Sequence, residues 1–116
     1  MDFATARRFL IAQAVQPVPG QVSFIQCLRQ GAPPVPGQVT SILLALKTVT
    51  QTLAHEPTLE RSLAHAFFVL TYESRQLYLQ GQQSGVDWPP LLSEDLTRIA
   101  EAVQTILAQP LSDHGE

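Results

Sequence analysis

Hydrophobic residues recur along the chain at steps of three and four positions, which is the spacing of one face of an α-helix. Near the N-terminus this pattern covers residues 3–14, with Asp2 placed to cap the helix, and it stops at the prolines of residues 17–19. A shorter pattern covers residues 19–30 and ends at Gly31. The first third of the chain therefore predicts a helix, a turn and a short second helix.

Two longer helices are predicted in the middle of the chain. The most apolar pattern runs over residues 39–53 and predicts the central helix, which we expect to end near Pro57. The next pattern predicts a long helix over residues 58–80, with Thr58 as its N-cap and with glycines at its end.

The last third predicts a connector and a final helix. Two prolines make the stretch GVDWPPLL over residues 85–92 non-helical, and Ser93 then caps a helix that Pro110 stops. No convincing alternating pattern of a β-strand occurs. We expect an all-α fold, a small bundle of four to five helices joined by proline-rich turns. It forms a single domain over residues 1–110 with a disordered tail over 111–116.

The hexapeptide Pro-Val-Pro-Gly-Gln-Val occurs twice, at residues 17–22 and 34–39. Proline suits the first position of a helix, so we interpret both copies as helix starts with the same chemistry. The alternative, a proline-rich ligand for an SH3-like partner, is weakened by the valine and glycine that interrupt the prolines. Only the second copy continues into an unbroken apolar helix. If the hexapeptide matters beyond folding, residues 33–39 are the place to look.

Composition changes the picture of the surface. Charged residues make up 15% of the 116 residues, glutamine occurs 13 times, and the net charge is −3. Soluble domains usually carry about 25% charged residues. Weak charge repulsion favours self-association or docking on other proteins, although the same composition can reflect only its source. The absence of a basic face argues against nucleic-acid binding.

The chain shows no secretory leader, and its longest uninterrupted apolar run is far shorter than the ~18 residues that a membrane span needs. Its one cysteine, Cys27, lies among apolar residues, so we expect a buried thiol and no internal disulfide. These observations predict a soluble, cytoplasmic protein, and they leave peripheral association with a membrane open.

Three stretches resemble a family of short, uncharacterised, all-helical cyanobacterial proteins: QGAPPVPGQVTSILLALK at 30–47, SRQ at 74–76 and SGVDWPPLLSEDLTRIAEAV at 84–103. Members of this family are sometimes labelled dethiobiotin synthetase, which is a P-loop ligase. The present chain lacks the Gly-x-x-x-x-Gly-Lys-Ser/Thr loop that such a label requires. The resemblance implies a cyanobacterial cell and a link to photosynthetic or carbon metabolism, and it transfers no catalytic residue.

Candidate catalytic and metal-binding groups do not form a pattern. His55 and His65 are not spaced like a zinc-binding helical pair, and His114 lies in the tail. No Gly-x-Ser-x-Gly stretch occurs, and Glu94-Asp95 fits a helix start, where negative charge is stabilised. We expect no enzyme activity, no cofactor and no metal.

A second face of the long predicted helix carries the main candidate site. Phe68, Tyr72, Arg75 and Leu79 follow one another at steps of four, three and four residues. Aromatic residues and arginine are enriched at the centres of protein interfaces. We therefore predict that this face binds a partner or a second copy of the chain. The alternative is a long helix that is buried on two sides within the monomer.

Trp88 completes the candidate partner-binding residues. Held by two prolines, it can either plug the bundle, which we favour, or present itself to a partner. The sequence as a whole predicts a non-enzymatic interaction module, an adaptor, assembly factor or regulator, that forms a homodimer. The alternative is a small-molecule sensor whose pocket lies between helices near Trp88, Arg75 and Tyr72.

Overall fold

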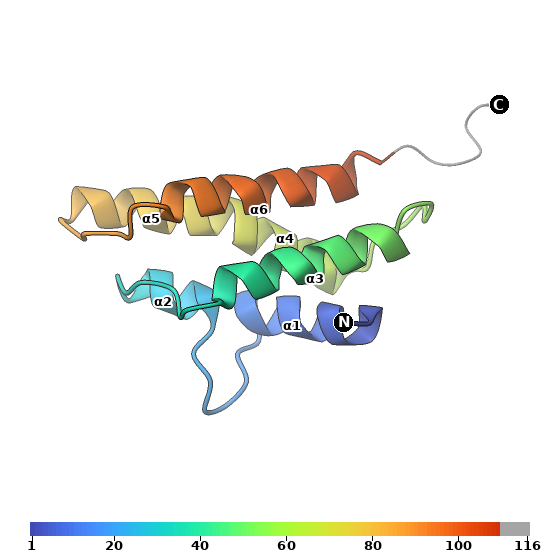
Figure 1. Cartoon of the computed structure of the whole chain (residues 1–116), viewed down its shortest axis with the longest axis horizontal. Coiled ribbons are helices and arrows are strands. Elements are labelled where there is room, and N and C mark those ends of the chain that lie inside the picture. The colour runs from blue at the N-terminus through green and yellow to red at the C-terminus, as the bar shows by residue number, and fades with distance from the viewer. Residues whose placement is uncertain (110–116) are drawn as a thin grey trace.

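Apolar stripes on every predicted helix converge on one core in the computed structural model, which describes residues 1–109 (Figure 1). Over these residues the chain forms five helices and no strand, as the sequence predicts. Their bounds are α1 Phe3–Ala14, α2 Phe24–Arg29, α3 Gln38–Thr52, one long helix made of α4 Arg61–Phe68, η1 Val69–Glu73 and α5 Ser74–Gln83, and finally α6 Leu92–Leu107. The tail expected at 111–116 lies outside the described residues.

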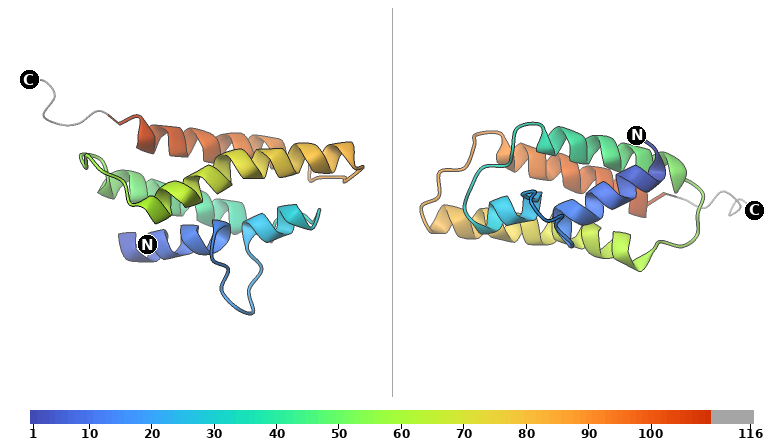
Figure 2. Two further views of the ribbon diagram at one scale, coloured as in Figure 1. Left: turned by 180° about the vertical axis from the view of Figure 1, so that it is seen from behind. Right: turned by 90° about the horizontal axis from the view of Figure 1, so that it is seen from below.

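The helices form a bundle in which α3 and α6 lie on one side and the long helix α4–η1–α5 lies on the other (Figure 2). α1 packs against both α3 and α4, while α2 packs against α5. Leu10, Phe24, Ile42, Leu46 and Phe67 are among the side chains that lie fully inside. The bundle is therefore held by the apolar face of each helix.

The first two helices test the predicted boundaries. α1 matches the prediction, and the Asp2 carboxylate accepts a hydrogen bond from the Thr5 N–H at 2.8 Å as its cap. α2 begins at Phe24, not near residue 19, so its predicted start was wrong. The reason is a capping box: Ser23 Oγ accepts from the Gln26 N–H at 3.2 Å, and Gln26 Oε1 accepts from the Ser23 N–H at 2.9 Å.

Two predicted caps were also wrong. The long helix begins at Arg61 with Glu60 as its N-cap residue, so Thr58 lies in the connection before it. The same helix continues through Gly81 to Gln83. Ser93 lies inside the first turn of α6, and its hydroxyl accepts a hydrogen bond from Arg75 instead of capping the helix.

Both hexapeptide copies form the same tight turn. In Val18–Gln21 and in Val35–Gln38, the N–H of the glutamine donates to the carbonyl oxygen of the valine, at 3.0 and 2.9 Å. The glycine of each turn has φ +83°, the value that a type II turn requires after proline. Only the second turn leads directly into a helix, α3, while the first lies in a loop that extends away from the helices (Figure 1). The helix-start interpretation was therefore right for the second copy and wrong for the first.

An ion pair fastens α1 to the start of the long helix. Arg7 Nε donates to Glu60 Oε1 at 2.6 Å, and Arg7 Nη2 lies against Glu60 Oε2. These hydrogen bonds lower the pKa of Glu60 and raise the pKa of Arg7. A carboxyl with a lowered pKa contributes to stability above its unfolded-state pKa, near 4.5, and this contribution is lost as the pH falls through the folded-state value.

We expect Glu60→Gln to lower the free energy of unfolding at neutral pH, because the amide cannot replace the charged partner of Arg7. The difference from the wild type should disappear as the pH falls through the lowered pKa of Glu60, and it should shrink in high salt because the pair is solvent-exposed. Chemical denaturation over a series of pH values measures this difference, with Glu101→Gln on the exposed side of α6 as the control. An effect of equal size at every pH contradicts the assignment to charge.

Candidate functional site

The most exposed aromatic surface lies where α4 passes into η1. Phe68 and Tyr72 stack with their ring centroids 5.1 Å apart and an interplanar angle of 27°. Their exposed fractions are 51% and 54%. We call Phe68 and Tyr72 the aromatic pair. At these two positions the long helix is therefore not buried on a second side within the monomer, and the binding of a partner by this face stays a prediction.

A π-helical turn follows Phe68 and changes the direction of the side chains that come after it. The Ser74 N–H donates to the carbonyl of Val69, five residues earlier, and the Ser74 hydroxyl donates to the carbonyl of Leu70 at 2.5 Å. Buried Ser74 thus satisfies the Leu70 carbonyl, whose usual α-helical partner would be the Ser74 N–H. A wider turn delays the helix phase, so regular spacing misplaces the residues beyond it.

Arg75 shows the consequence of this π-helical turn. Its guanidinium donates to the Ser93 hydroxyl, the Ser93 carbonyl and the Thr97 hydroxyl, each at 3.0 Å, and it lies 5.3 Å from the centroid of the Tyr78 ring. Arg75 therefore joins α5 to α6 and does not lie free beside the aromatic pair as predicted. Leu79 is exposed further along α5.

Trp88 is the plug that the sequence favours. It is 8% exposed, its Nε1 donates to the carbonyl of Tyr78 at 2.9 Å, and its ring stacks on that of Tyr78 with centroids 6.0 Å apart. The ring lies directly against the backbone of Gly81: a Cβ at residue 81 would be 2.5 Å from Trp88 Cζ2. Trp88 is thus buried in the monomer, as the favoured interpretation predicts, and partner binding by this residue stays a prediction.

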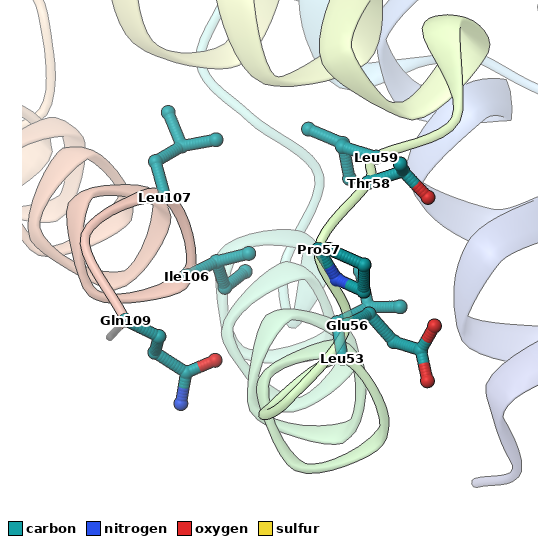
Figure 3. A pocket seen from close by; sticks show the side chains of 8 residues that line it. All are labelled: Leu53, Glu56, Pro57, Thr58, Leu59, Ile106, Leu107 and Gln109. Carbon is teal, nitrogen blue, oxygen red and sulfur yellow. The ribbon is translucent and has the colours of Figure 1, made fainter. Parts of the chain in front are cut away.

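The three residues of the expected pocket face different surroundings: Trp88 is buried, Arg75 is bonded to α6 and Tyr72 is half-exposed. A different pocket, of about 240 Å³, lies between the α3–α4 connection and the end of α6 (Figure 3). Its lining is mixed, because Glu56 and Thr58 from the α3–α4 connection add polar groups to the aliphatic side chains, and Gln109 reaches it from beyond the end of α6. Within the described residues, Gln109 Oε1 is buried without a hydrogen-bond partner.

The two hexapeptide copies come together in space around a second hollow, of about 450 Å³. The first copy contributes Gln21 and Val22, and the second contributes residues 35–38. α1 adds Phe9 and Gln13. The sequence singled out residues 33–39, but it missed that the first copy would share a hollow with them. We call this the hexapeptide hollow.

The remaining candidate groups lie apart from these surfaces. His55 and His65 are exposed, His114 is outside the described residues, and Cys27 is buried as predicted. No cluster of three metal-ligating side chains occurs among residues 1–109. Asp95, in the first turn of α6, pairs with Arg98 at 3.2 Å.

Comparison of the chain with protein-family models, curated proteins and solved structures gave no match. Among the described helices, each is too short or too polar to cross a membrane.

Proposed function

We propose that this protein is a non-enzymatic protein–protein interaction module and that the aromatic pair is the centre of its interface. The supporting observation is that Phe68 and Tyr72 are both half-exposed and already stacked on each other. Large aromatic side chains supply much of the binding energy at interface centres. Because the rings support each other before binding, little side-chain freedom remains to be lost when a partner covers them.

The proposed first partner is a second copy of the chain. A chain in which only 15% of the residues are charged has little electrostatic repulsion between like molecules, which supports a homodimer. We further propose that the dimer works as an adaptor, assembly factor or regulator in a cyanobacterial cytoplasm, with a link to photosynthetic or carbon metabolism. This part of the proposal is supported only by the resemblance of residues 30–47 and 84–103.

Exchange of both aromatic residues for serine tests the proposal. We expect the wild type to sediment as a dimer and Phe68→Ser/Tyr72→Ser to sediment as a monomer with an unchanged far-ultraviolet circular dichroism spectrum. Leu44→Ser is the matched control, because Leu44 is an equally exposed apolar residue on α3. The proposal fails if the wild type is monomeric and if the double variant retrieves the same proteins from a cyanobacterial lysate as the wild type does.

A small-molecule sensor remains the second candidate, and the pocket of Figure 3 is the observation that favours it. The buried acceptor Gln109 Oε1 offers one polar contact, in a pocket that Glu56 and Thr58 also line. Ligand sites usually occupy about 300–1,000 Å³, so only a compact ligand suits this pocket. A ligand that raises the melting temperature without changing the sedimentation of the wild type would favour the sensor.

A further inference from the structure

We propose that the hexapeptide hollow binds a short, neutral, aliphatic peptide segment in an extended conformation. In this proposal the Gln13 side chain donates a hydrogen bond to a main-chain carbonyl of that segment. The hollow is a second binding surface, and it depends on neither Phe68 nor Tyr72.

Hydrogen bonds fix the orientation of two buried glutamine side chains, Gln13 and Gln38, beside the hollow. Gln13 Oε1 accepts from the Phe24 N–H at 2.8 Å and from Gln38 Nε2 at 3.0 Å. Gln38 Nε2 also donates to the Val22 carbonyl at 3.1 Å, and Gln38 Oε1 accepts from the Val35 N–H at 3.1 Å. Because a backbone N–H can only donate, these contacts fix which end of each amide is oxygen.

The side-chain NH₂ group of Gln13 is left without a partner in the described part of the chain. Gln13 is 8% exposed, and its Nε2 donates to no acceptor within residues 1–109. This nitrogen is nevertheless not sealed from solvent, unlike the buried acceptor of Gln109. Since Gln13 lines the hollow, its Nε2 offers two N–H donors that no acceptor within residues 1–109 takes, and these donors are available to a bound ligand.

The walls define the chemistry of the ligand. Phe9, Val22, Val35 and Pro36 give apolar sides, and none of the residues that line the hollow is charged. A carboxylate or an ammonium group would lose water here without gaining an opposite charge. A peptide bond instead offers a neutral carbonyl oxygen between aliphatic side chains, which suits both the donor and the walls.

The hollow is also preformed. The second type II turn forms one wall, and its Gln38 donates to Gln13 of α1 and to the carbonyl of Val22, the residue after the first turn. The volume of about 450 Å³ lies in the range of about 300–1,000 Å³ typical of ligand sites. Little reordering of the protein is therefore needed when a segment enters.

The test follows the side-chain NH₂ signals of Gln13 in proton–nitrogen correlation spectra of the full chain. The probes are tripeptides of alanine, valine, leucine and proline, acetylated at one end and amidated at the other. We expect at least one probe to bind with a dissociation constant below about 1 mM and to shift the Gln13 NH₂ signals downfield. If no probe shifts these signals, the proposal is wrong.

Gln13→Glu is the sharpest variant, because a carboxylate still accepts from Phe24 and Gln38 but no longer donates into the hollow. We expect at least tenfold weaker tripeptide binding, and unchanged binding by the exposed control Gln51→Glu. Val22→Ser, which removes an exposed wall residue, should weaken binding severalfold even if Gln13→Glu fails to fold. Unchanged binding by a folded Gln13→Glu, or by Val22→Ser, overturns the proposal.

Two further arms separate the alternatives. Binding of a small amide such as isobutyramide without binding of any tripeptide overturns the peptide assignment. The Phe68→Ser/Tyr72→Ser variant should bind the tripeptides as the wild type does, so loss of dimerisation and loss of tripeptide binding are distinguishable results. Loss of tripeptide binding in this variant would contradict a separate site.

Discussion

Replacing Gly81 by alanine should destabilise the protein by about 2 kcal/mol, the cost of forcing one methyl group into a filled space. In an ordinary exposed helix the same change would stabilise by about 1 kcal/mol. The effect of the substitution on stability is reversed here, because the new Cβ would lie 2.5–2.8 Å from three atoms of the Trp88 ring. Either the ring moves out or the helix shifts, and in both cases the Trp88–Tyr78 hydrogen bond is strained.

Urea unfolding followed by tryptophan fluorescence measures this effect, since Trp88 is the only tryptophan. The folded variant should emit further to the red than the wild type and be quenched more readily. Gln83→Ala, at an exposed position two residues further along α5, is the control and should stay within about 0.5 kcal/mol of the wild type. A Gly81→Ala variant that is more stable than the wild type would show that Trp88 is not seated as described.

Gln38→Ala should cost about 3 kcal/mol, because it removes the hydrogen-bond partner of three polar groups at once, and one of these groups, on Gln13, is buried. The Val35 N–H and the Val22 carbonyl would lose their bonds to the Gln38 amide, and Gln13 would lose a donor. The repeat offers a matched control in Gln21→Ala, which is the same substitution at the same place in the first copy. Gln21 is exposed, so its replacement should change the free energy of unfolding by less than about 0.5 kcal/mol.

Chemical denaturation of both variants at one pH measures the difference between the copies. If Gln38→Ala and Gln21→Ala lower the free energy of unfolding equally, the side-chain hydrogen bonds of Gln38 add nothing to stability beyond what a glutamine contributes at this position of the turn. If the effects differ as expected, the two copies share a turn but only the second provides a structural side chain.

The fold class and most helix faces could be predicted from the sequence, because burial of one face requires apolar residues every three to four positions. The helix boundaries were less accurate. The Ser23–Gln26 pair that starts α2 is visible in the sequence as a capping box, but the proline of the preceding hexapeptide was given more weight. The π-helical turn has no comparable signature, so the position of Arg75 could not be predicted from regular spacing.

The candidate sites depend on contacts between distant segments, which periodicity cannot supply. Gly81 and Trp88 are separated by a chain reversal, and only the structure shows that one makes room for the other. The sequence shows that the hexapeptide is repeated, but only the structure shows that the two copies lie side by side around one hollow. A useful signal was nevertheless present: Gln13 adjoins the apolar stripe of the first helix, where an uncharged polar residue calls for a buried partner.

The π-helical turn holds one residue more than a regular turn, and the facing of α5 depends on it. A helix turns by about 100° per residue, so a regular α-helical path with the same number of residues would rotate everything after Ser74 by about that angle. Arg75 would then turn away from Ser93, and Gly81 would turn away from Trp88. Deleting one residue between Leu70 and Ser74 would instead restore a regular helix and leave α5 facing as it does. A chain that shares this bundle and lacks one residue here can therefore keep the same contacts between α5 and α6 without a π-helical turn.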